Sequence, residues 1–153
     1  MLAVRVRFPL RVQIQSEKQS ESGVSSSEFH SFSHSNSLGM FDFQKLEVYK
    51  KAKVFHTDLK SLIESQALSY TEKDQLYRAS FSIALNIAEG SGRFSERDRR
   101  NFFVIARSSV FECVAILDIL KDGSIITERT YSDFEAKADE LSRMLFGLIR
   151  KLG

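Results

Sequence analysis

The chain contains no tryptophan, one proline, one cysteine and only seven glycines among its 153 residues. A single cysteine excludes an internal disulfide, so we expect a reducing, cytoplasmic compartment. The lone proline, Pro9, lies near the N-terminus and leaves every later helix without an interior proline. No run of 18 or more apolar residues occurs, which excludes a membrane-spanning helix.

The chain also has almost no excess of charge of one sign, because its formal net charge is only +2. Such a balance does not require a nucleic-acid or membrane partner, and it does not exclude a local basic patch. Hydrophobic residues make up 42% of the chain and charged residues 27%. This composition and length are typical of one globular domain.

The first 39 residues differ from the rest in composition. Ten serines fall within the 22 residues from Ser16 to Ser37. Such a segment buries too little apolar surface to offset its chain entropy, so we predict a disordered leader at residues 1–39 and a folded domain at 40–153. Two interpretations stay open: a functional tail, or a misassigned start with Met40 as the true first residue.

Helical periodicity runs through the whole of the second part. Apolar residues recur at spacings of 4, 3, 4 and 3 in the first stripe, formed by Val48, Ala52, Phe55, Leu59 and Leu62. Similar stripes predict four helices at about 43–64, 71–89, 96–121 and 132–152. Matched lengths and short connections favour an all-α, up-down-up-down four-helix bundle.

Capping signals set the expected helix ends. Ser69 with Glu72 is typical of a capping box, and so is Ser132 with Glu135. Ser95 is the expected N-cap of the third helix. Three glycines are expected to end helices, Gly90 and Gly92 after the second and Gly123 after the third, because glycine accepts the left-handed backbone of a C-cap.

The third predicted helix is apolar over an unusually wide arc. Its members are Phe102, Phe103, Ile105, Val110, Phe111, Val114, Ile116, Leu117 and Ile119. They cannot all face one bundle interior, so burial on a second side is expected. Another subunit can cover that side; the alternative is that this is the most central helix of a monomer.

Residues with catalytic or metal-binding chemistry are sparse. His56 has no second His or Cys three or four residues away, so it is expected at the rim of the bundle. Cys113 lies in an apolar stretch without a base and is expected to be buried and structural. The glycines near Arg93 lack the Gly-Lys-Ser/Thr ending of a nucleotide loop. We therefore expect no enzymatic activity, no cofactor and no metal.

Three polar residues interrupt the apolar stretches: Asn86, Glu89 and Glu112. A buried carboxylate needs a cationic or hydrogen-bonding partner. We expect structural roles for all three, with Glu112 paired to an arginine such as Arg78 or to a group of a neighbouring subunit.

Basic residues cluster between the second and third helices. The candidates for nucleic-acid binding are Arg93, Arg97, Arg99, Arg100 and Arg107, with weaker candidates at Lys50 and Lys51. Further charge on the fourth helix comes from Arg143, Arg150 and Lys151. Repetition around a symmetric ring would strengthen the field that attracts phosphates. The alternative is an ordinary solvated surface.

Several segments together resemble the 23S rRNA intervening-sequence protein family, also called four helix bundle proteins. The most specific is Ser82-Ile83-Ala84-Leu85-Asn86-Ile87-Ala88-Glu89-Gly90. Residues 46–52, 92–93, 102–106 and 109–112 add to it, and the likeness covers about 41–152. It implies a bacterial bundle that forms a homopentamer without enzymatic activity. Related accessory proteins bind nucleic acid and a reverse transcriptase.

Two functions follow as hypotheses. The first is a ring-forming module that binds RNA or DNA phosphate backbones. The second is an assembly scaffold that recruits a protein partner without binding nucleic acid. An enzyme is disfavoured, because no acid–base or metal-ligand set is found.

Overall fold

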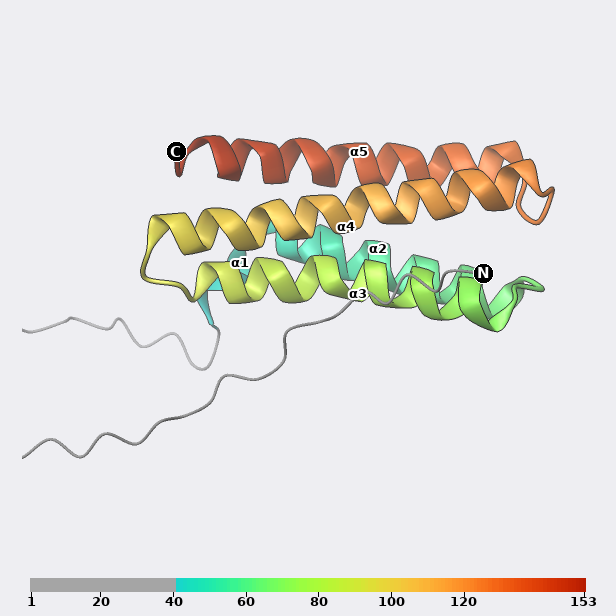
Figure 1. Cartoon of the computed structure of the whole chain (residues 1–153), viewed down its shortest axis with the longest axis horizontal. Coiled ribbons are helices and arrows are strands. Elements are labelled where there is room, and N and C mark those ends of the chain that lie inside the picture. The colour runs from blue at the N-terminus through green and yellow to red at the C-terminus, as the bar shows by residue number, and fades with distance from the viewer. Residues whose placement is uncertain (1–40) are drawn as a thin grey trace, which may run out of the picture. The chain divides into compact units, whose positions relative to one another are not determined.

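Five helices make up residues 41–153, the part of the chain that the computed structural model describes (Figure 1). They are α1 (Asp42–Lys45), α2 (Glu47–Ser65), α3 (Tyr70–Ser91), α4 (Glu96–Asp122) and α5 (Glu128–Arg150). No residue of this range lies in a strand. The four long helices run up and down in turn, which confirms the predicted all-α bundle. The leader expected at residues 1–39 lies outside the described residues.

Each long helix packs against two neighbours around one core: α3 contacts α2 and α4, and α5 contacts α4 and α2. All four contribute fully buried side chains, as the expected stripes require. The largest of them are Phe55, Leu59, Leu76, Ile83, Ile87, Val110, Leu117, Leu120, Leu141 and Leu145. Within the described residues no helix combines the length and hydropathy needed to cross a membrane.

The first expected helix, 43–64, is interrupted near its start. Leu46 has an extended backbone (φ −67°, ψ 126°), which ends α1 and begins α2. Its side chain is partly buried against the core. Neither proline nor glycine marks this break, so the sequence carries no signal for it.

Two of the three expected N-caps are confirmed. The Ser69 hydroxyl accepts from the Glu72 amide at 3.3 Å while the Glu72 carboxylate accepts from the Ser69 amide at 2.7 Å. Ser95 likewise accepts from the Asp98 amide at 3.4 Å.

The start expected at Ser132 for the last helix is wrong. Thr127 Oγ1 accepts from the Thr130 amide at 3.1 Å, so α5 begins one turn earlier. Glu135 instead accepts from the Tyr131 hydroxyl at 2.9 Å. Burial of the Tyr131 ring explains the longer helix, since it adds an apolar contact before the expected cap.

The glycines follow the expectation only in part: Gly92 and Gly123 are the C-caps of α3 and α4, as expected, but none of the three has a left-handed backbone. Gly90 lies inside α3, and Gly92 at its end has φ −86°, so neither uses left-handed backbone. A Cβ on Gly90 would lie 2.9 Å from Phe103 Cε1 and 3.0 Å from Phe102 Cβ. Gly90 therefore allows α4 to approach α3 closely. After α4 it is Ser124, not Gly123, that has a positive φ, of 57°.

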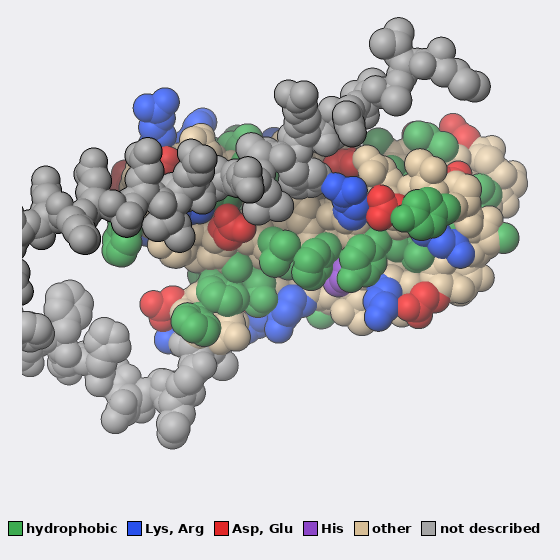
Figure 2. All heavy atoms as spheres, turned by 60° about the horizontal axis from the view of Figure 1, so that its bottom comes forward, with side chains coloured by type: hydrophobic (Ala, Val, Ile, Leu, Met, Phe, Trp, Pro, Cys, Tyr) green, Lys and Arg blue, Asp and Glu red, His purple; other side chains and the backbone are tan. Residues whose placement is uncertain are grey.

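The wide apolar arc of α4 is only partly covered within the chain. Phe103, Val110 and Leu117 are buried, but Ile105 and Ile119 are 49% and 66% exposed. On the adjacent α3, three large side chains one turn apart are also exposed, namely Tyr77, Phe81 and Leu85. Figure 2, which turns the α3 side forward, shows hydrophobic side chains in a row there. We call Phe81, Leu85, Ile105 and Ile119 the α3–α4 apolar face.

Cys113 is buried in the core, as expected. Burial, and then the charge of Glu112, raise the pKa of its thiol to about 12. We expect Ellman's reagent to modify Cys113 only after unfolding, since the nucleophile is the thiolate. The measurement is the absorbance change with and without denaturant; equal rates in both would contradict this environment.

Candidate nucleic-acid interface

Three of the five candidate arginines lie on one side of α4. Arg97, Arg100 and Arg107 are spaced by three and seven residues, which places them along one stripe of a helix. Arg107 Nε donates to Ser142 Oγ of α5 at 3.1 Å. This contact shows that the stripe faces the side of α4 next to α5.

Arg107 lies between two aromatic rings from different helices. Its guanidinium carbon is 4.8 Å from the ring centre of Phe111 on α4 and 5.4 Å from that of Phe146 on α5. Arg150 contributes a second cation to Phe146 at 5.9 Å. Both rings remain about half exposed, at 52% and 47%. We call Arg97, Arg100, Arg107 and Arg150, with these two rings, the arginine face.

The part of the chain that the structure describes places no acid beside the guanidinium groups of the arginine face. Within residues 41–153, none of its four guanidinium groups has a carboxylate within 4.0 Å. Arginines beside exposed aromatic rings can meet both the phosphates and the bases of a nucleic acid. This arrangement distinguishes the arginine face from an ordinary surface of alternating charge.

The other two candidate arginines lie elsewhere. Arg93 is 3.5 Å from the Glu89 carboxylate and lies over the Phe102 ring at 4.5 Å. Arg99 Nη2 donates to the Arg93 carbonyl at 3.0 Å, which ties the start of α4 to the preceding turn. Arg99 also lines a cavity at this end of the bundle.

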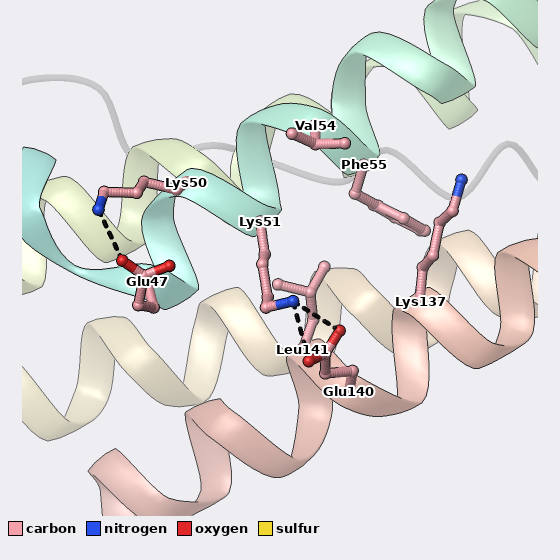
Figure 3. Close-up of a pocket in the computed structure, with 8 residues that line it drawn as sticks. All are labelled: Glu47, Lys50, Lys51, Val54, Phe55, Lys137, Glu140 and Leu141. Atoms are coloured by element: carbon pink, nitrogen blue, oxygen red, sulfur yellow. Dashed lines mark hydrogen bonds and ion pairs between the residues drawn. The ribbon is translucent and has the colours of Figure 1, made fainter.

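Both lysine candidates belong to a groove between α2 and α5 (Figure 3). Lys51 Nζ contacts the Glu140 carboxylate at 2.9 Å, and Lys50 Nζ contacts that of Glu47 at 2.6 Å. Lys137, on the opposite wall, pairs with Asp58 at 2.8 Å. The groove has a volume of about 320 Å³. Its three lysines are thus compensated by acids, unlike the arginine face.

The three polar candidates have unequal surroundings. Asn86 is half-buried and donates to the Ser82 carbonyl at 2.8 Å and to its hydroxyl at 3.0 Å. Ser109 Oγ of α4 donates to the same Ser82 hydroxyl at 3.0 Å, so these groups join α3 to α4.

Glu112 is not the buried carboxylate that its sequence context suggests. It is exposed in the chain, and it accepts a hydrogen bond from Gln75 Nε2 at 3.2 Å. Arg78, the partner considered above, lies 3.6 Å from Asp74. Glu112 points in a different direction around the axis of α4 from the buried stripe that carries Cys113, so its carboxylate reaches water.

One polar cluster has no counterpart among the expected sites. His56 Nδ1 lies 2.8 Å from Ser80 Oγ, which itself donates to the Tyr77 carbonyl at 2.9 Å. The imidazole also contacts the rings of Tyr77 and Phe81. Burial, followed by the charge of Lys60, lowers the pKa of His56. Ser80 is fully buried, whereas His56 is partly exposed, so the hydroxyl of this pair is shielded from water.

Sequence spacing held a partial signal for the arginine face. Phe111 stands four residues after Arg107, and Phe146 stands four before Arg150, the spacing of neighbours on a helix. What joins the two pairs is the packing of α4 on α5, which spacing within one helix does not reveal. The described residues contain no group of three or more His, Cys, Asp or Glu side chains placed to hold a metal.

Comparisons with known proteins agree with this fold. A crystal structure of a protein of unknown function from the S23 ribosomal protein family of Bacteroides thetaiotaomicron superposes with a TM-score of 0.62 and 24% sequence identity. The match covers 67% of the present chain and 97% of that protein. A search of curated proteins gives no match. The family model described as 23S rRNA-intervening sequence protein matches residues 44–147, well over half of the chain. The chain therefore belongs to the 23S rRNA-intervening sequence protein family.

Proposed function

We propose that this protein is a self-associating, non-enzymatic module that binds RNA or DNA through the arginine face. The observation that carries the proposal is the cluster of Arg107 with Phe111 and Phe146, flanked by cations that no acid of residues 41–153 neutralises. Guanidinium groups supply contacts to phosphates, and half-exposed rings supply stacking surfaces for unpaired bases. Single-stranded or looped segments suit such a face better than a duplex, whose bases are already stacked.

Self-association is the second part of the proposal. The α3–α4 apolar face leaves Phe81, Leu85, Ile105 and Ile119 exposed, and these lie on two helices that pack side by side. Covering them with a second copy would remove apolar surface from water. The resemblance to homopentameric bundles suggests five copies, and a ring would repeat the arginine face at each position.

A non-catalytic role is supported by the burial of two reactive groups, the Cys113 thiol and the Ser80 hydroxyl. Cys113 is buried with a raised pKa, and the hydroxyl that His56 contacts is buried too. Neither can meet a substrate.

The test is filter binding of a looped ribosomal RNA at two salt concentrations. Replacing Arg100 and Arg150 together by glutamine should weaken binding and reduce the slope of log affinity against log salt by about 2, because each lost phosphate contact removes about one unit. Arg129→Gln/Lys73→Gln is the matched control, with equal charge loss away from the arginine face. It should retain most of the affinity and the slope.

Two outcomes would count against binding through this face. Native protein that retains no RNA at low salt would leave the recruitment of a protein partner as the better function. An equal loss in both double variants would show that net charge alone decides binding.

A further inference from the structure

A second cavity lies at the end of the bundle where α1, the start of α4 and the end of α5 meet. It has a volume of about 330 Å³. Its wall is largely apolar and includes Phe43, Phe103 and Leu148. Two cations, Arg99 and Lys151, also line it. The cavity is thus apolar in its walls but cationic at two points.

Arg99 is the unusual member of this wall. Its Nε is shielded from water and has no hydrogen-bond partner within the described residues. Nη2 donates to the Arg93 carbonyl, and no carboxylate of residues 41–153 lies within 4.0 Å of the guanidinium. Buried charges in proteins are normally paired, because loss of hydration without compensation is costly. A half-buried guanidinium without a counter-ion among the described residues therefore indicates a place for an anion.

We propose that this cavity binds a small monocarboxylate with an apolar tail, such as a medium-chain fatty acid. The carboxylate would contact Arg99 and Lys151, and the hydrocarbon tail would pack against Phe43, Phe103 and Leu148. A guanidinium presents two parallel donors that match the two oxygens of a carboxylate. A single negative charge suits a mostly apolar wall better than the double charge of a phosphate monoester.

The neighbouring groups are consistent with such a ligand. Asp42 also lines the cavity, but its carboxylate is 96% exposed and lies 3.0 Å from Lys45 Nζ. Its charge is therefore compensated at the rim. The carboxylate would accept from donors of this guanidinium, including the Nε that has no hydrogen-bond partner within the described residues. Nη2 keeps its bond to the Arg93 carbonyl, which belongs to an exposed turn.

The first experiment is isothermal titration calorimetry of the full chain with sodium octanoate as the probe. We expect saturable binding of octanoate and at least tenfold weaker binding of 1-octanol, which has the same tail without the charge. Octyl phosphate keeps the tail and so tests the choice of head group. Inorganic phosphate has no tail and so tests whether the tail is needed. Octanol binding as tightly as octanoate would overturn the role of the anion. Octyl phosphate binding as tightly would overturn the choice of a carboxylate, and tight binding of inorganic phosphate would overturn the role of the tail.

Variants locate the site. Arg99→Met keeps the length of the side chain but removes its charge, and it should weaken octanoate binding at least tenfold. It should still fold, with an unchanged or higher melting temperature, because it removes a poorly compensated charge from a half-buried position. Arg143→Met is the matched control, since Arg143 is exposed and pairs with Asp139 at 3.0 Å.

A second variant reduces the volume of the cavity and leaves its charge unchanged. Leu148→Phe enlarges a residue of the cavity wall, keeps both cations and should also weaken octanoate binding. Unchanged affinity in Arg99→Met, or an equal loss in Arg143→Met, would overturn the assignment of the site.

Discussion

Replacing Gly90 by valine is expected to lower the free energy of unfolding by about 3 kcal/mol, the upper end of the usual cost of overpacking. Even the first added carbon would lie 2.9 Å from the Phe103 ring and 3.0 Å from Phe102 Cβ. Phe103 is buried and Phe102 Cβ is attached to the α4 backbone, so neither can move without shifting the helix. Valine adds two further methyl groups to this contact. The melting temperature should fall on the order of 10 °C.

Gly147 provides a matched control, for which the expected change in the free energy of unfolding has the opposite sign. It lies inside α5, and a Cβ built on it would meet no atom within 4 Å. Gly147→Ala should therefore raise the free energy of unfolding by about 0.5–1 kcal/mol, through the lower entropy of the unfolded chain. Urea denaturation followed by circular dichroism measures both variants. A Gly90→Val protein as stable as the native chain would show that α3 and α4 pack less closely than described.

The role of Gly90 illustrates what helix periodicity can and cannot predict. Each long helix was predictable because its apolar stripe is a local property that the core then buries, as at Leu76 and Leu117. The sequence also indicates that Gly90 stands near a helix end. Its contact with Phe103 depends on how closely two helices approach, which no local pattern encodes. A glycine needed for space was therefore interpreted as a glycine needed for backbone conformation.

Helix starts likewise divide into those that a local pattern predicts and those that a tertiary contact decides. The capping box at Ser69 is a local device, and its prediction is confirmed. Ser132 with Glu135 has the same spacing, yet it lies inside α5, because Thr127 offers an earlier cap and the Tyr131 ring can be buried. Two competing caps five residues apart cannot be ranked from spacing alone. The tertiary contact decides between them.

For the candidate site, the seven-residue spacing of Arg100 and Arg107 is that of two residues on one face of a helix. It did not predict that α5 would add Phe146 and Arg150 to that face, since this requires the packing of two helices. Nor did spacing distinguish Arg99 from these residues. Arg99 immediately precedes Arg100 in the sequence, but it faces the end of the bundle. Adjacent residues of a helix point about 100° apart, so a cluster in sequence divides among several surfaces.

Glutamate substitutions on the α3–α4 apolar face are expected to convert an oligomer into monomers. Phe81→Glu with Ile105→Glu would place two carboxylates where apolar side chains are exposed at 43% and 49%. In a symmetric assembly each copy repeats the pair, so every interface receives buried, unpaired charges, at a cost that exceeds ordinary association energies. Sedimentation equilibrium or mass photometry should give the monomer mass for this variant and a multiple of it for the native chain.

The free energy of unfolding of the single chain should fall only modestly in that variant, because both residues are surface positions of the monomer and Phe81→Glu removes one ring contact with His56. Val54→Glu is the control: Val54 is 57% exposed on α2, lines the α2–α5 groove and should leave the mass unchanged. A native chain that sediments as a monomer would contradict self-association directly. An assembly that survives both glutamates would place the contact on another surface. Under the proposed function an assembly would present several arginine faces to one RNA, so the monomeric variant should also bind the looped RNA more weakly while its own arginines remain intact.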